Sequence, residues 1–168
     1  MALDDATPAA YRVEFTIPCA PVAKKRARVT RNGTYTPSDT RTFETHARLF
    51  ARTAMGHLNP TRDAVMLEMV AFVPIPKSWS RAKRARALAG LLFPISRPDL
   101  DNYEKAVTDA LNGICYEDDS QICDVVKSKR YSDTPSVFVT VRPIDGFNAD
   151  PFYVPKAMQR KTKGAKKS

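Results

Sequence analysis

The chain has 168 residues, of which 43% are hydrophobic, which is enough for one folded domain with a core and too few to expect two. No apolar run is long enough to span a bilayer, and the first ten residues include two aspartates and no hydrophobic segment, so we expect neither a membrane anchor nor a secretory signal. Three cysteines without a close CxxC pair predict reduced, mostly packed thiols in a cytoplasmic protein.

Most of the net charge of +9 belongs to the C-terminal end. Residues 156–168 contain six Lys or Arg and no acidic residue, so the other 155 residues carry a net charge of only +3. Such a tail is typical of a solvated, disordered end, and it can also attract phosphate without sequence specificity. We therefore expect a disordered start over residues 1–10, one domain over residues 11–145 and a flexible basic tail over residues 146–168.

The N-terminal part is predicted to be extended. Residues 11–17 alternate apolar and polar side chains, which predicts a strand. A basic loop follows, and its Asn32-Gly33 pair is typical of a two-residue hairpin turn, so we expect a short hairpin over residues 29–36. The cations of this loop are candidate contacts to a phosphate backbone: Lys24, Lys25, Arg26, Arg28 and Arg31.

In the middle of the chain we expect a helix, a strand and a second helix. The first helix is predicted to begin at Asp39, as its N-cap, and to end at Gly56. Residues 64–73 are largely apolar and predict a buried strand. Ser78 is predicted to cap a helix over residues 79–88, which supplies a second set of candidate DNA contacts: Arg81, Lys83, Arg84 and Arg86.

The clearest helix spans residues 99–112. Its apolar side chains recur at helical spacing, and Asn112-Gly113 is a typical end. Two strands, residues 122–131 and 136–142, are predicted after it, joined by a turn. This order of elements predicts a single α+β domain with a mixed or antiparallel sheet packed against helices.

Carboxylates gather around the start of that helix. Asp99 lies at its N-cap with Asp101 two residues later, and Lys105 follows Asp101 by one turn on the same face. Capping, an i,i+4 ion pair and solvated charge would explain these residues alone. The acidic segment Glu117-Asp118-Asp119, however, could fold back beside the first helical turn. Hard oxygen ligands from two segments are what Mg²⁺ prefers, so the two groups together favour a metal site.

A basic protein has an electrostatic reason to gather acids where a cation lies between them and phosphate. Metal-activated water can hydrolyse a phosphodiester, and Lys105 could orient that water or neutralise charge on the phosphate. The sequence therefore indicates phosphodiester chemistry on nucleic acid.

These residues resemble the signature of the RusA family of small endodeoxyribonucleases, which resolve Holliday junctions and are often carried by phages and prophages. The similarity spans roughly residues 12–142. It rests on Pro98 to Asn102, Lys105-Ala106, Asp109 to Gly113 and Asp118 to Ile122, and it extends upstream to Lys24 to Arg28, Thr34 to Pro37 and Pro76 to Ser80.

The resemblance implies a RusA-like fold and a homodimer that requires Mg²⁺, for which Mn²⁺ can substitute. It places the metal-binding role on Asp99, Asp101 and Asp119, with Asp118 in support, and the role of catalytic lysine on Lys105. Two sites related by a two-fold axis would cut two strands of like polarity in a four-way junction. It also implies a cytoplasmic, nucleoid-associated enzyme of phage or prophage origin, without an organic cofactor or membrane contact.

The early loop reads Lys25-Arg26-Ala27-Arg28 where many relatives have Gly-Arg-Pro-Arg, a departure that keeps its charge. Lys127, Lys129 and Arg130 could contact the cut strand, although a solvated face is the simpler interpretation. Two other functions stay open. One is a nuclease for flaps, D-loops or RNA hybrids, and the other is a non-catalytic DNA-binding protein whose acids serve as caps and ion pairs.

Deleting residues 156–168 tests the role of the tail. We expect weaker DNA binding at low salt and an affinity that depends less on salt, because phosphate-neutralising charges are lost. The measurement is the dissociation constant of the full and shortened chains across a salt series, with cleavage chemistry expected to persist. An unchanged salt dependence would show that the tail has no role in binding.

Overall fold

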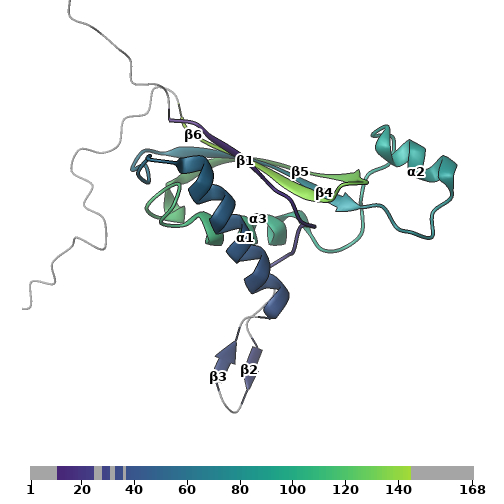
Figure 1. Cartoon of the computed structure of the whole chain (residues 1–168), viewed down its shortest axis with the longest axis horizontal. Helices are drawn as coiled ribbons and strands as arrows, with labels where there is room; N and C mark the ends of the chain where they lie inside the picture. Colours follow the sequence, from purple (N-terminus) through teal and green to yellow (C-terminus); the bar gives the residue numbers. More distant parts are fainter. Residues whose placement is uncertain (1–10, 25–27, 31–32, 36, 145–168) are drawn as a thin grey trace, which may run out of the picture.

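A four-stranded sheet in the order β1-β6-β4-β5 lies at the centre of the computed structural model, which describes residues 11–24, 28–30, 33–35 and 37–144 (Figure 1). The pair β4–β5 is parallel, whereas β1–β6 and β4–β6 are antiparallel, so the sheet is mixed. A separate antiparallel hairpin is formed by β2 and β3. The strands are β1 Val13–Ile17, β2 Arg28–Thr30, β3 Gly33–Tyr35, β4 Val65–Pro74, β5 Ile122–Ser132 and β6 Ser136–Pro143.

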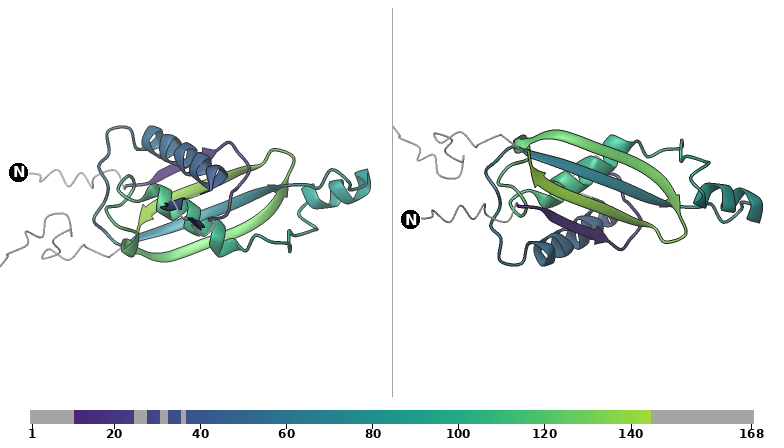
Figure 2. Two further views of the ribbon diagram at one scale, coloured as in Figure 1. Left: turned by 90° about the horizontal axis from the view of Figure 1, so that it is seen from below. Right: turned by 90° about the horizontal axis from the view of Figure 1, so that it is seen from above.

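Two helices, α1 (Ser38–Met55) and α3 (Leu100–Leu111), cover the same face of the sheet, and Figure 2 shows no helix on its other face in the described part of the chain. The shorter α2 (Arg81–Leu88) projects beyond the end of the sheet, and a 3-10 helix, η1 (Asp119–Gln121), precedes β5. This arrangement confirms the predicted single α+β domain. None of the described helices is long and apolar enough to cross a membrane.

The core fills the space between the sheet and α1 and α3. Along β1, Val13, Phe15 and Ile17 are buried while the residues between them are exposed, as the alternating sequence predicts. In β4, Leu67 and Met69 are almost fully buried, and each such side chain contributes about 1.5–3 kcal/mol relative to exposure. The apolar sides of α1 and α3 complete the core, so their polar sides face outward.

Two predicted helix starts are wrong by two residues. α1 begins at Ser38 after Pro37, and Asp39 lies in its first turn instead of at the cap, where its carboxylate still favours the helix dipole. α2 is capped by Ser80, whose hydroxyl accepts a hydrogen bond from the Lys83 amide at 3.3 Å, and not by Ser78. The chain forms a turn before α2, with the Trp79 amide bonded to the Pro76 carbonyl.

The predicted strands near residues 11–17, 64–73, 122–131 and 136–142 are confirmed. A hairpin is present where one was predicted, but Gly33 belongs to β3 and pairs with Thr30 instead of lying in the turn, and Asn32 lies outside the described residues. The last two strands are consecutive in sequence but are not neighbours, because β4 lies between them. The predicted disordered start at residues 1–10 and the basic tail at residues 146–168 lie outside the described residues.

The cysteines provide a test of this packing. Burial raises the pKa of the Cys115 thiol to about 12, whereas Cys123 is exposed on β5. Because the thiolate is the reacting form, we expect iodoacetamide at pH 8 to label Cys123 in the folded protein and Cys115 only after unfolding. Mass spectrometry of digested, alkylated protein would show this, and equal labelling of both in the folded protein would contradict the fold.

Candidate active site

The helix α3 presents one apolar and one polar side. Tyr103 and Val107 are buried in the core, so Asp101 and Lys105 lie on the exposed side. Asp99 is the N-cap residue, as predicted, and is itself exposed. Its carboxylate makes no capping hydrogen bond, so this side chain is free of that role.

An open groove of about 370 Å³ runs between α3 and the start of β5. It brings together residues from three elements: Asp101, Glu104, Lys105 and Thr108 of α3, Asp119 of η1, and Ile122 and Val125 of β5. Two acidic segments that are 18 residues apart in sequence, at Asp101 and Asp119, therefore share one site. The sequence had suggested that the second segment could fold back beside the helix.

A reversal after α3 brings the second acidic segment to the groove. Gly113 has a φ of +73°, a conformation that side chains other than glycine rarely adopt, and its amide donates to the Tyr116 carbonyl at 2.8 Å. The fully buried Tyr116 then donates its hydroxyl to the Thr108 carbonyl of α3 at 3.0 Å. Burial, followed by nearby negative charges that include Asp119, raises the pKa of Tyr116, which keeps the hydroxyl a donor.

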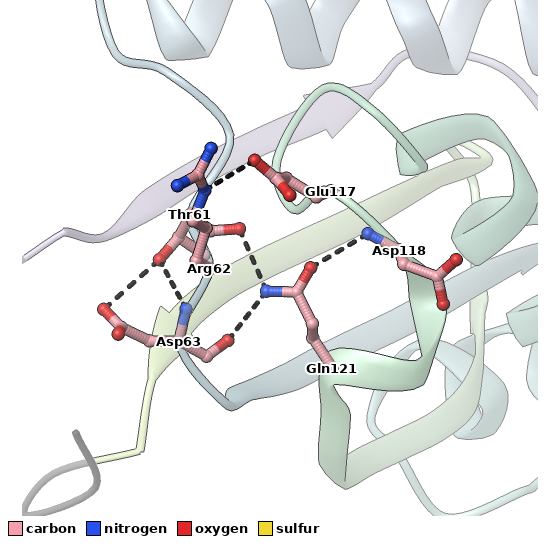
Figure 3. A network of polar contacts seen from close by, with 6 residues as sticks. All are labelled: Thr61, Arg62, Asp63, Glu117, Asp118 and Gln121. Carbon is pink, nitrogen blue, oxygen red and sulfur yellow. Dashed lines mark hydrogen bonds and ion pairs between the residues drawn. The ribbon is translucent and has the colours of Figure 1, made fainter. Parts of the chain in front are cut away.

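Gln121 fixes the segment that carries Asp119 (Figure 3). Its side-chain amide donates to the Thr61 and Asp63 carbonyls at 2.9 and 3.0 Å, and its oxygen accepts from the Asp118 amide at 2.9 Å. The Asp118 carboxylate in turn accepts from the Ser120 amide at 3.0 Å, which completes a capping box around η1. This glutamine was missed in the sequence, although its spacing of three from Asp118 is that of a capping box.

The other members of the acidic segment face different partners. Glu117 is bound by the guanidinium of Arg62 at 2.8 Å, in the same 61–63 segment that Gln121 contacts (Figure 3). Asp118 is engaged as the cap of η1 and does not line the groove, and Asp99 does not line it either. Of the four proposed metal ligands, the groove therefore contains Asp101 and Asp119. It also contains Glu104, which was not predicted and whose carboxylate pairs with Lys127.

The donor chemistry of the groove suits Mg²⁺, because carboxylate oxygens from two segments face an open space with room for water and phosphate. The geometry is not that of a finished metal centre. Within residues 11–24 and 37–144, no group of three or more His, Cys, Asp or Glu side chains is arranged to hold an ion. Asp101 and Asp119 are the residues best placed to hold an ion, and Asp99 lies two residues before Asp101.

Of the proposed DNA contacts in the early basic loop, Lys24 is the one whose side chain the structure describes. Lys24 pairs with Glu44 of α1 and, at 2.9 Å, with Asp109 of α3. Partial burial disfavours its charge, but its hydrogen bonds to these two carboxylates outweigh that cost and raise its pKa. Its ammonium therefore fastens the start of the basic loop to the helices. Lys25, Arg26 and Arg31 lie outside the described residues, and Arg28 belongs to β2, where the structure does not describe side chains.

The cations of α2 are better exposed. Arg81, Lys83 and Arg86 are exposed and Arg84 is half-buried. The Lys83 ammonium lies 4.0 Å from the centre of the Trp79 ring, and this ring packs edge-on against Tyr131 of β5 at 5.1 Å. Residues 75–98, which contain α2, include six basic residues and no acidic one. This segment is therefore a positively charged projection, and its C-terminal end leads directly into Asp99.

Comparison with known proteins points in the same direction. Residues 18–142 match the protein family described as Endodeoxyribonuclease RusA. The chain is also 38% identical over 137 residues to the Bacillus subtilis (strain 168) protein called "Uncharacterized protein YqaN", an alignment that covers 79% of this chain and 96% of the relative.

Replacing Gln121 tests how the second acidic segment is held. Gln121→Ala removes three hydrogen bonds from a buried position, and we expect the free energy of unfolding to fall by about 2 kcal/mol. Amide exchange of residues 117–121 should also become faster. Urea unfolding and hydrogen exchange measure these effects. The control is Ser120→Ala, which changes an exposed side chain and should leave both unaltered; equal behaviour of the two variants would contradict the assigned role.

Proposed function

The chain belongs to the RusA endodeoxyribonuclease family, and we propose that it is a Mg²⁺-dependent homodimer that resolves Holliday junctions by paired symmetric cuts. The family acts on branched junction DNA and is generally dependent on a divalent metal. The observation that carries the proposal is the groove in which Asp101 and Lys105 of α3 meet Asp119 of η1. The same proposal includes action in recombination and repair at the nucleoid, and a phage or prophage origin.

Three side chains of the groove have roles in the proposed hydrolysis of a phosphodiester: Asp101, Asp119 and Lys105. Asp101 and Asp119, with Asp99 at the helix start, supply oxygen ligands for Mg²⁺. When bound, this ion supplies a Lewis acid and lowers the pKa of a water nucleophile. Lys105 lines the groove and makes no ion pair with the described residues, so its ammonium is available to neutralise charge on the phosphate. Asp118 contributes indirectly by capping η1.

In this proposal the basic side chains contact the phosphates of the DNA backbone. Non-specific phosphate contacts suit an enzyme that recognises a branched shape, because they provide affinity without reading bases. The exposed cations of α2 are the main described candidates, and Arg28, Lys25, Arg26 and Arg31 belong to the same proposal through the sequence. A two-fold dimer would present two grooves to the pseudo-two-fold axis of a four-way junction, which accounts for symmetric cutting.

Cleavage of a synthetic mobile four-way junction, with cut positions mapped on all four strands, tests this function. In Mg²⁺ we expect paired cuts on strands of like polarity. Asp101→Asn and Asp119→Asn should lower the cleavage rate by at least about 100-fold while junction binding is kept or becomes tighter, because several kcal/mol of charge stabilisation are lost and a negative charge facing phosphate is removed. Asp99→Asn should behave in the same way.

Asp124→Asn is the matched control, since this aspartate is exposed on β5 outside the groove and its loss should leave cleavage intact. Full cleavage by Asp119→Asn would overturn the site. Equal rates on a flap or linear duplex would instead support a nuclease for other branched DNA. Binding that is indifferent to Mg²⁺, without any nicking, would support a non-catalytic DNA-binding protein.

A further inference from the structure

Two lysines of β5 hold the segment that contains Asp99 and Asp101. Lys127 and Lys129 are two residues apart and pair in register with Met69 and Ala71, so both side chains lie on the helix-covered face of the sheet. The Lys129 ammonium donates to the backbone carbonyls of Ser96 at 2.9 Å and Pro98 at 3.0 Å. The Lys127 ammonium pairs with the carboxylate of Glu104.

These contacts lie on both sides of the helix start. Ser96 and Pro98 lie three residues and one residue before Asp99, and Glu104 lies about one turn beyond Asp101. The loop has little else to hold it: residues 95–99 are all exposed, and Ile95 is 97% exposed. Among the described residues, the two bonds from Lys129 are the only hydrogen bonds made by residues 95–98.

The same strand begins beside the other half of the site. η1, which carries Asp119, leads directly into β5 at Ile122. A tether from β5 to the loop before α3 therefore sets the distance between the two acidic segments that share the groove. The acidic side chains of the described residues are not yet grouped closely enough to hold an ion. The position that the tether gives to Asp99 and Asp101 therefore decides how easily they converge on an ion together with Asp119.

We propose that Lys129 is a positioning residue for phosphodiester cleavage: through the Ser96 and Pro98 carbonyls it sets Asp99 and Asp101 in place against Asp119. This inference rests on the proposed function and adds a residue to it. A direct contact with DNA is the competing role for Lys129. Two of its three N–H donors are already used by the loop, which leaves the ammonium poorly placed as a phosphate contact.

The variant Lys129→Met removes the tether and keeps the length of the side chain. The two carbonyls lie in an exposed loop, where water can satisfy them, so the fold should persist. We expect the single-turnover cleavage rate at saturating enzyme to fall by about 10- to 100-fold, because a misplacement of about 1 Å in a reacting site can cost about 100-fold. The Mg²⁺ concentration for half-maximal rate should rise, while junction affinity stays unchanged.

Two further variants make the result specific. Lys129→Arg keeps a cationic donor that can reach both carbonyls, and it should recover most of the rate. Arg48→Met removes one positive charge from an exposed side chain of α1 that does not line the groove, and it should leave the rate and the Mg²⁺ dependence unaltered. Hydrogen exchange of residues 96–105 gives a readout that is independent of cleavage: it should be faster in Lys129→Met and normal in the other two.

The outcomes separate this inference from the proposed function. Normal exchange at residues 96–105 in Lys129→Met, or weaker junction affinity with an unchanged saturated rate, would overturn the positioning role. A wild-type protein that cuts no branched DNA would overturn the proposed function, and the exchange experiment would then still decide whether Lys129 holds the start of α3.

Discussion

The parallel pairing of β4 with β5 is the constraint on which the site depends. Parallel neighbours cannot be joined by a tight turn, so the chain must leave the end of β4, cross a face of the sheet and return to the starting end. That crossing segment contains α2, α3 and η1. The groove lies between this crossing and the strand to which it leads, so residues of α3 and η1 meet there as a result of topology.

β5 also forms one edge of the sheet, which explains why it combines exposed side chains with lysines that contact α3 and the loop before it. An edge strand has neighbours on one side only, and its exposed side chains include Val125, at the groove, and Asp124. Its middle section carries the lysines that reach back to α3 and to the loop before it. A single strand thus forms a wall of the groove, follows Asp119 and holds Asp99 in place, which makes β5 a structural part of the site.

The sequence allowed the fold class, most strands and the helix at residues 99–112 to be predicted, because their apolar periodicity reports burial that the structure then shows. It placed Asp101, Lys105 and Asp119 in one site through the resemblance and through the spacing of the acidic segments. It gave Asp118 a supporting place beside Asp119 among the metal ligands, whereas the structure uses Asp118 to cap η1, a role that sequence spacing alone did not assign. Glu104 was missed, and Lys129 was named only as a possible contact to the cut strand, because their contacts join residues 23 to 33 positions apart. The role of Gln121 was missed because two of its three hydrogen bonds reach residues 58 and 60 positions away. Periodicity does not encode such long-range contacts.

The lysines of this protein differ in what their charge is used for. Lys24 is held between Glu44 and Asp109, Lys127 is paired with Glu104, and Lys129 is bonded to two carbonyls. Each of these fastens a segment to α3 or to the loop before it. Lys105 is the lysine of the groove without an ion pair to the described residues. If any of the fastening lysines also bound phosphate, its release from the protein would loosen the acidic segments at the moment when they must converge. A Lys105 without an ion pair avoids that conflict, and it leaves recognition of the DNA backbone to cations farther from the groove, such as those of α2.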